Sequence, residues 1–376
     1  MNVISLCQEL IRFPSVTPAD SDIMNYLVSI LEPRGFTCHL LPHTDDRGQT
    51  IHNLYARRGT SSPNLCFAGH VDVVPIGAEE LWLHPPFSGN IYNGNIWGRG
   101  AVDMKGAIAS FILATENLSH KGSISLLITG DEEGLATHGT IKVIEWLKER
   151  NETIDFCIVG EPTSDKVLGD TLKIGRRGSL SGTLTVTGVQ GHVAYPNKAE
   201  NPIPNMIKLL SVLDGCVLDN GYKNFQPSNL EITSIDTGGT ADNIIPATIS
   251  ASFNVRYNPT YNRTSLTQHL QKWLDTAGIH YKVDFKGGAE PFLTENHAAL
   301  ALMTQAIIEK TKVIPEYLTS GGTSDARFIR MVAPVIEFGL LNSLAHKVNE
   351  QVATQDLEDL VVIYRRFIDL YFTTQP

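Results

Sequence analysis

The chain has few cysteines, fewer basic than acidic residues, and no long apolar run. Its five cysteines are odd in number and none are in CxxC spacing, which argues against a disulfide framework or a thiolate zinc site. Thirty Lys and Arg against forty Asp and Glu give a charge of −10, which argues against a nucleic-acid binder. No stretch approaches eighteen apolar residues, and the N-terminus lacks a basic start followed by an apolar run. We therefore expect a cytoplasmic protein that binds no membrane.

The remaining composition and its patterning predict an α/β protein of two domains. Forty-two per cent of the 376 residues are apolar, which is enough for a packed interior. The runs LCFAGH, SISLLIT and DFCIVG read as buried strands that alternate with helical patterns, as in a mostly parallel sheet flanked by helices.

The pattern changes near residue 179. From there the order β-α-β-β-α-β is that of a ferredoxin-like split βαβ module, after which the α/β pattern resumes. We predict a catalytic metal-binding domain formed by residues 1–178 and 293–376, interrupted by an inserted domain at residues 179–292.

Carboxylates and imidazoles follow several of these apolar runs. Such side chains at strand ends are what a divalent metal site in an α/β protein requires, and they predict hydrolysis by metal-activated water. The residues are His70, Asp103, Glu132, Glu133, Glu161 and His346.

Each motif has a simpler explanation when it is taken alone. The pair His70 and Asp72 suits a hydrogen-bonded surface histidine, and Asp103 suits an N-cap of the following helix. The acidic run that contains Glu132 and Glu133 suits a solvated loop. Together, however, the residues form a balanced set, in which three adjacent carboxylates after a buried strand repel one another unless a cation relieves them.

The set divides between two metal ions. One ion takes His70 and Glu161, the other takes His346 and Glu133, and Asp103 bridges them, which leaves a place for a shared water. Of two neighbouring glutamates, one can bind metal while the other holds the water and moves its proton.

At this point the chain resembles the zinc aminoacylase and carboxypeptidase family over nearly its whole length. The runs GHVDVVP, GRGAVDMKG, TGDEEG and GEPTS, followed by a distant His, carry the resemblance. It implies two Zn²⁺ per subunit, with Co²⁺ or Mn²⁺ able to substitute at one site, and a homodimer formed through the inserted dimerisation or lid domain. Glu132 matches the general base and Asp72 the residue that supports the first histidine. The implied metal ligands are His70, Asp103, Glu133, Glu161 and His346.

Further runs resemble one member of that family closely, namely GDTLKIGRRGS, VQGHVAYPNKAENP, GGTADNIIP, NVRYN, SGGTSDARF and EFGLLNSLAHKVNE. The resemblance implies a small-molecule substrate with three carboxylates and one ammonium, which cationic and neutral hydrogen-bonding groups can recognise. Of Arg176 and Arg177, we expect at least one to be structural. The implied substrate-binding residues are Lys173, Arg176, Ser179, Tyr195, Asn243, Arg256, Thr323 and Asn342.

His192, within GVQGHVAYP, has two interpretations. It can cap a strand as a turn histidine, or it can donate to the developing oxyanion in the other subunit's site, as the family resemblance implies and as we expect. The predicted reaction is the hydrolysis of an N-acyl amide. A related N-acyl amino acid deacylase, such as an acetylornithine deacetylase, remains an alternative, as does a non-catalytic binding protein. The latter would be expected to lack the base or a ligand, and all are present.

Overall fold

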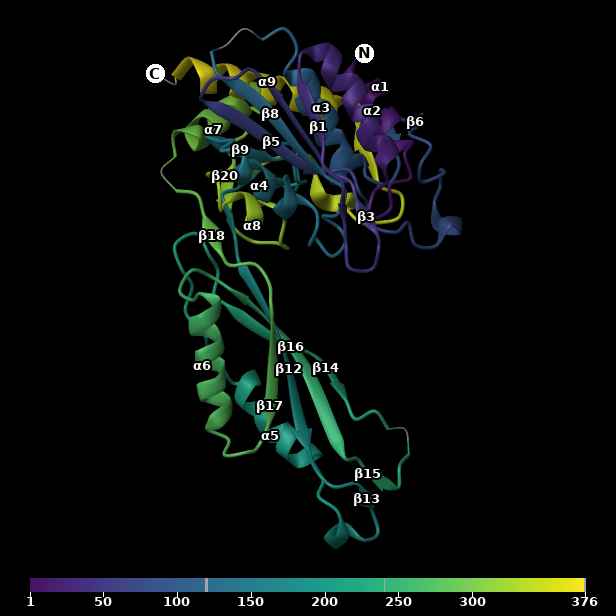
Figure 1. Cartoon of the computed structure of the whole chain (residues 1–376), viewed down its shortest axis with the longest axis vertical. Helices are drawn as coiled ribbons and strands as arrows, with labels where there is room; N and C mark the ends of the chain where they lie inside the picture. Colours follow the sequence, from purple (N-terminus) through teal and green to yellow (C-terminus); the bar gives the residue numbers. More distant parts are fainter. Residues whose placement is uncertain (119–120, 240, 296, 375–376) are drawn as a thin grey trace. The chain divides into compact units, whose positions relative to one another are not determined.

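The computed structural model describes residues 1–118, 121–239, 241–295 and 297–374 (Figure 1). The chain folds as two compact units. Unit 1 comprises Met1–Ile174, Thr294–Leu318 and Ser324–Pro376, and unit 2 comprises Gly175–Leu293 and Thr319–Thr323. The boundaries therefore fall within a few residues of 178/179 and 292/293, except that the short segment Thr319–Thr323 belongs with unit 2.

Unit 1 is built on an eight-stranded sheet in the order β1-β4-β8-β5-β9-β20-β10-β19. The four central strands are parallel to one another, β4 and β1 add antiparallel strands at one edge, and β10 pairs antiparallel with β20. The predicted α/β class with a mostly parallel sheet is confirmed. The strands are β1 Thr37–Leu40, β4 Leu54–Arg58, β5 Asn64–His70, β8 Ser123–Thr129, β9 Phe156–Val159, β10 Thr171–Lys173, β19 Glu316–Leu318 and β20 Val335–Glu337.

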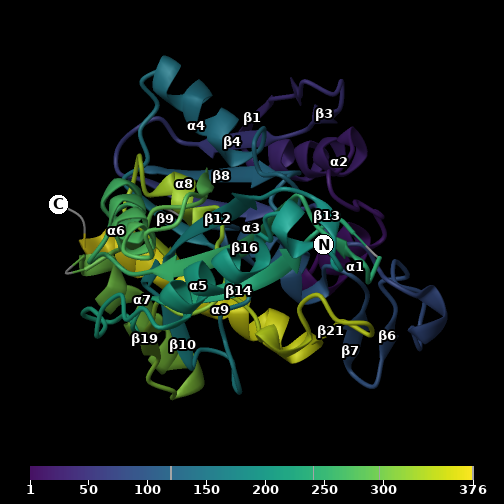
Figure 2. The same ribbon diagram turned by 90° about the horizontal axis from the view of Figure 1, so that it is seen from below.

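Helices cover the sheet of unit 1, and Figure 2 shows α4 and α9 on opposite sides of it. Helix α3 is buried along its whole length and packs against α9, whose buried residues recur every three or four positions as one apolar stripe. Asn2 begins α1 with a capping box. The helices are α1 Val3–Ile11, α2 Ser21–Leu31, α3 Gly106–Ala114, α4 Thr140–Glu149, α7 Ala298–Thr311, α8 Ala326–Ile329 and α9 Thr354–Thr374.

A small three-stranded sheet joins part of the segment 75–100 to the chain just before α9. The hairpin β6 (Ile91–Tyr92) and β7 (Asn95–Trp97) pairs with β21 (Gln351–Ala353), which lies just before α9. This pairing brings the chain around residue 350 beside the chain around residue 98, where the main-chain N–H of Gly98 donates to the carbonyl of Glu350 at 2.9 Å.

Unit 2 has the predicted β-α-β-β-α-β order, with the antiparallel sheet order β14-β16-β12-β17. Inward residues of the long strand β12 alternate with outward ones, and the inward set packs on the leucines of two helices. The elements are β11 Gly175–Arg176, β12 Gly178–Thr187, β13 Gly191–His192, α5 Ile203–Asp214, β14 Asn229–Asp236, β15 Ile244–Ile245, β16 Thr248–Tyr257, α6 Arg263–Asp275, β17 Lys282–Gly287 and β18 Phe292–Leu293.

No helix among residues 1–118, 121–239, 241–295 and 297–374 is long and apolar enough to cross a membrane.

Candidate metal centre

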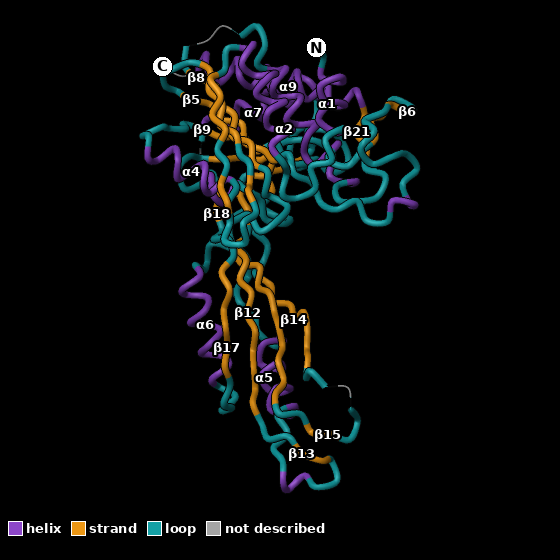
Figure 3. The backbone as a smooth tube through the Cα atoms, turned by 45° about the vertical axis from the view of Figure 1, so that its right-hand side comes forward, coloured by secondary structure: helices purple, strands orange, loops and turns teal. Residues whose placement is uncertain are grey.

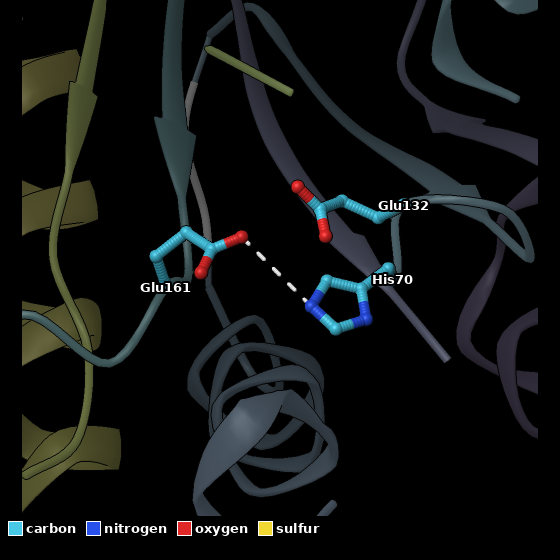
Figure 4. A group of neighbouring side chains, drawn as sticks. All are labelled: His70, Glu132 and Glu161. Carbon is cyan, nitrogen blue, oxygen red and sulfur yellow. Dashed lines mark ion pairs between the residues drawn. The ribbon is translucent and has the colours of Figure 1, made fainter. Parts of the chain in front are cut away.

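Three neighbouring parallel strands deliver the first group of metal-type side chains to one edge of the sheet. His70 is the last residue of β5, Glu132 follows β8, and Glu161 follows β9. Because parallel strands end at the same edge, residues far apart in sequence meet there. Donor atoms of these three side chains lie within 4.8 Å of one another. Figure 4 shows the carboxylates of Glu132 and Glu161 near the His70 ring, and the dashed line marks the ion pair between His70 and Glu161.

The His70 ring is buried and held in one orientation. Its Nδ1 donates to the main-chain carbonyl of Asp72 at 2.8 Å. Its Nε2 lies 3.1 Å from Oδ1 of Asp103 and 3.8 Å from Oε1 of Glu161. With Nδ1 occupied by the carbonyl, Nε2 is the nitrogen that can bind a cation.

Asp103 lies between two histidines. Its Oδ1 faces His70, while its Oδ2 lies 3.2 Å from Nε2 of His346. The same nitrogen of His346 lies 2.7 Å from Oε1 of Glu133. Helix α3 begins at Gly106, three residues later, with Lys105 at the N-cap position. The carboxylate of Asp103 therefore does not serve as a helix cap but lies between the side chains of His70 and His346.

The electrostatics of the cluster show a strong demand for positive charge. The hydrogen bonds that His346 donates to Asp103 and Glu133 raise the pKa of His346 to about 10. Burial opposes protonation of His70, but the hydrogen bond and charge of Asp103 outweigh it and raise the pKa of His70 well above its ordinary value. Burial and the charge of Glu161 raise the pKa of Glu132 well above its ordinary value. Protons on the two imidazoles thus neutralise carboxylates that a divalent cation can neutralise instead.

The donor chemistry fits divalent metal ions of the zinc type. Imidazole nitrogens and carboxylate oxygens are the ligands of Zn²⁺, and they also accept Co²⁺ and Mn²⁺. Within the part of the chain that the structure describes, two groups of three side chains have donor atoms within 4.8 Å of one another, namely His70 with Glu132 and Glu161, and His70 with Asp103 and Glu133. The first group includes Glu132, which the family resemblance assigns to proton transfer rather than to metal binding.

Asp72, which we expected to support the first histidine, lies beside the His70 ring. Its carboxylate is fully buried and lies 3.7 Å from Nδ1 of His70, which binds the main-chain oxygen of Asp72 instead. The two carboxylate oxygens accept the main-chain N–H groups of Glu132 (3.2 Å) and Glu133 (3.0 Å). Asp72 therefore supports the histidine through its backbone and fixes the two glutamates through its side chain.

Several buried charges around Asp103 have no role in the sequence-based prediction. Arg99, Lys105 and Glu350 are at most 2 % exposed. Lys105 donates to the carbonyl of Phe13 at 2.8 Å, and burial lowers its pKa to about 7. The signal in the sequence was the concentration of charge within the apolar, glycine-rich run GRGAVDMKG. No spacing rule connects that run with Glu350.

Two of the predicted substrate-binding residues lie in unit 1. Lys173 is buried at the end of β10, where its Cα is in register with that of Glu337 on β20. Asn342 is exposed and begins a short 3-10 turn, and its main-chain N–H donates to the carbonyl of Ser164 at 2.8 Å.

Four others gather at the start of the unit 2 sheet. Ser179 on β12 is directly opposite Arg256 on β16. Arg176 donates to the carbonyls of Ser320 (3.3 Å) and Gly322 (3.2 Å), so its guanidinium binds the segment that contains Thr323. These bonds explain why Thr319–Thr323 belongs with unit 2, although the sequence pattern placed it in the larger domain.

The neighbouring arginine has a separate partner. Arg177 donates to Oδ1 of Asn229 at 2.8 Å. This contact within the sheet agrees with the expectation that at least one of the two adjacent arginines is structural.

The remaining two, Tyr195 and Asn243, lie with His192 beyond the other end of β12. The rings of His192 and Tyr195 are 5.8 Å apart, and the main-chain N–H of Val193 donates to the carbonyl of Asn243 at 3.1 Å. All three predicted residues are exposed. Figure 3 shows β13 and β15, which carry this cluster, where the strands of the unit 2 sheet end. Residue 240, within the GGTADNIIP run, lies outside the described residues.

Comparison with known proteins identifies the class. Residues 66–370 match the model of Peptidase family M20/M25/M40, and the chain belongs to this family. The predicted membership in a family of metallohydrolases is confirmed. Among curated relatives, the chain is 51 % identical over 374 residues to the succinyl-diaminopimelate desuccinylase of Xanthobacter autotrophicus, covering 99 % of this chain and 100 % of the relative. It is 50 % identical to the protein of the same name from Caulobacter sp. strain K31, covering 98 % and 96 %.

Solved structures share the fold at low sequence identity. The M20 family metallo-carboxypeptidase Sso-CP2 of Sulfolobus solfataricus superimposes with a TM-score of 0.81 at 19 % identity, covering 99 % of this chain and all of the other. The YXEP protein of Bacillus subtilis, described as a dinuclear metal binding peptidase, has a TM-score of 0.72 at 15 % identity, covering 99 % and 98 %.

We predict that metal loading releases protons and strengthens as the pH rises. Because the pKa of His346 is about 10 without metal, this histidine is protonated at pH 7 and must lose its proton to bind an ion. Its stabilising contacts in the metal-free protein are complete below about pH 6.5 and are lost as the pH rises through about 10. Titration calorimetry with Zn²⁺ in buffers of different ionisation enthalpy should show release of at least one proton per chain.

The matched control for this measurement is His346→Ala. This variant should release fewer protons and should bind the ion predicted at His346 and Glu133 more weakly. A binding heat that is independent of the buffer would contradict the prediction.

Proposed function

We propose that the chain hydrolyses N-succinyl-L,L-2,6-diaminopimelate to succinate and L,L-diaminopimelate, a step of lysine and diaminopimelate biosynthesis. The supporting observation is the identity of about half of all residues, over nearly full length, to relatives named succinyl-diaminopimelate desuccinylase. The complete set of predicted ligands at one edge of the sheet accords with a hydrolase.

The proposal places two zinc ions at this edge. His70 and Glu161 would hold one ion, His346 and Glu133 the other, and the two oxygens of Asp103 would be shared between them. Such ions supply Lewis acidity and lower the pKa of water to near neutrality. Co²⁺ or Mn²⁺ can substitute at one site, because nitrogen and oxygen ligands accept several divalent ions.

Glu132 moves the proton. It lies beside His70 and Glu161, and Asp72 fixes its main chain. In this role its carboxylate takes a proton from the attacking water as the water oxygen bonds to the succinyl carbonyl carbon. The same carboxyl group then gives the proton to the amine nitrogen as the C–N bond breaks. The water is thereby divided between the two products.

Positive and neutral groups would bind the substrate's three carboxylates. Arg256 and Ser179 are adjacent across two strands, and Arg176 lies beside the segment of Thr323. Arginine is suited to planar recognition of carboxylates. The proposed set also includes Lys173 and Asn342, which belong to unit 1, and Tyr195 and Asn243, which lie with His192 and would act in the same site as His192.

His192 would act in the site of the other subunit of a homodimer. Ser179 and Thr187 are eight residues apart on β12, which separates them by roughly 26 Å, and His192 lies beyond Thr187. Because β13 pairs with β15, just before β16, His192 is held at that end. One copy of unit 2 therefore cannot bring His192 beside Ser179 and Arg256, which supports a contribution from a second copy.

The protonation of His192 suits an oxyanion donor. Its Nδ1 accepts the main-chain N–H of Ala194 at 3.1 Å, which leaves Nε2 to carry the proton. An N–H aimed at the carbonyl oxygen would stabilise the negative charge that develops there.

The proposal includes a cytoplasmic location, in agreement with five free cysteines.

The first test compares substrates. The zinc-loaded protein should hydrolyse N-succinyl-L,L-diaminopimelate, lose that activity with a chelator, and regain it when zinc is added back. N-acetyl-ornithine, assayed in parallel, should be a poor substrate. Preferential turnover of the acetyl compound would contradict the proposed substrate and favour the acetylornithine-type alternative.

A second test addresses Glu132. Glu132→Gln keeps the shape of the side chain but removes the base, so kcat should fall by about 10²- to 10⁴-fold. Zinc content, measured by mass spectrometry, should remain that of the wild type. Near-normal turnover with full zinc occupancy would rule out the general-base role.

A third test uses mixed dimers. His192→Ala should lower kcat by about 10²- to 10³-fold. When protomers with His192→Ala and Glu132→Gln are mixed, one of the two sites regains both groups if His192 acts in trans. Such mixed dimers should therefore recover about half of the wild-type activity. No recovery in dimers shown to be mixed would argue that His192 acts within its own chain.

A further inference from the structure

A buried ion pair lies next to the bridging aspartate. Nη1 of Arg99 donates to Oε2 of Glu350 at 2.9 Å, and the two side chains are 3 % and 0 % exposed. Burying a charge costs free energy unless the charge is fully hydrogen-bonded. The hydrogen bonds of this pair therefore indicate which segments of the chain it holds in place.

Glu350 binds the backbone of Asp103 itself. Its Oε1 accepts the main-chain N–H groups of Val102 at 3.0 Å and Asp103 at 3.2 Å. Asp103 has extended backbone angles, φ −123° and ψ 92°, between flanking helical turns. The position of its carboxylate therefore depends on how these two N–H groups are held.

Arg99 binds the segment that carries His346. Its Nη1 donates to the carbonyl of Lys347 at 2.9 Å, and its Nη2 donates to that of Pro75 at 3.4 Å. His346 has a positive φ of 62°, and 53 % of its side chain is exposed. An exposed side chain on an irregular segment receives little support from packing, so its main-chain attachment is what orients it.

We infer that Arg99 and Glu350 are positioning residues that set the second metal position, the one formed by Asp103, Glu133 and His346. This inference rests on the proposed two-metal function. The pair joins the peptide of Asp103 to the segment of His346, so the distance between these two ligands is set by one buried contact.

The two metal positions should depend on this pair unequally. His70 is in β5 with its Nδ1 bound to a carbonyl, and Glu161 follows β9, so the first position rests mainly on strands. The second position takes His346 from a segment that the pair attaches. Changes in residues that orient metal ligands typically lower metal affinity by about 10- to 100-fold.

Glu350→Gln is the sharpest test. It retains the shape and one acceptor oxygen, but it places an amide N–H₂ or a weaker acceptor against the guanidinium. Zn²⁺ titration by calorimetry, and Co²⁺ titration followed by visible absorption, should show the second ion binding about 10- to 100-fold more weakly. The first ion also uses Asp103 but keeps His70 and Glu161, so its affinity should fall by a smaller factor, and excess zinc should restore most of the activity.

Two further variants keep the inference testable. Arg99→Lys preserves the charge but loses the fork that reaches both Glu350 and Lys347, so it should weaken binding of the second ion in the same way. It provides the test if Glu350→Gln fails to fold. The matched control is Glu116→Gln, which removes the partly buried partner of Arg34, an ion pair that joins no segment bearing a metal ligand. This control should bind both ions as the wild type does.

Equal weakening of both ions, or no weakening of either, would overturn the inference. The measurement uses metal binding rather than turnover, so it separates this inference from the proposed substrate. A protein that binds two ions but does not cleave the succinyl compound would refute the proposed function and leave the positioning role standing.

Discussion

Repulsion among carboxylates at one sheet edge is the constraint on which the rest of unit 1 depends. Glu132, Glu133, Glu161 and Asp103 converge where water is largely excluded, and there like charges interact more strongly than in solution. In the metal-free chain, the same carboxylates raise the pKa values of His70 and His346, and protons on these two imidazoles reduce the repulsion. The buried carboxylate of Asp72 accepts the main-chain N–H groups of Glu132 and Glu133 and so holds these two glutamates in position despite the repulsion.

The charged residues that hold the centre together form an inner and an outer group. Histidines and carboxylates face the centre, and behind them Arg99, Lys105 and Glu350 each bind main-chain groups, while Arg99 and Glu350 also bind each other. A buried charge that binds main-chain groups fixes a loop more rigidly than apolar packing does, because its hydrogen bonds are directional. The centre is thus supported by an interior that is unusually polar for its depth.

Much of this could be predicted from the sequence, and the limits have physical reasons. The runs LCFAGH, SISLLIT and DFCIVG were recognisable as parallel strands, and parallel strands bring His70, Glu132 and Glu161 to one edge. The role of the Asp72 side chain was not predictable, because period-two spacing gives the face of a strand and not which donor lies opposite. The pairing of Arg99 with Glu350 joins positions 251 residues apart, and no local pattern encodes such a contact.

The long strand β12 fixes the distance between two clusters of residues in unit 2. Ser179 stands near its start and the His192 cluster beyond its end, and ten residues in register with β16 set the interval. Since neighbouring residues face opposite sides, inserting one residue would turn every following side chain to the wrong face. Unless a β-bulge absorbs the extra residue, as the irregularity between Ile232 and Ser234 on β14 does, the interval can therefore change only in steps of two residues, or about 6.6 Å. Loops can change length by one residue at a time. The separation between the Ser179 cluster and the His192 cluster, in contrast, is kept or changes by a whole two-residue step.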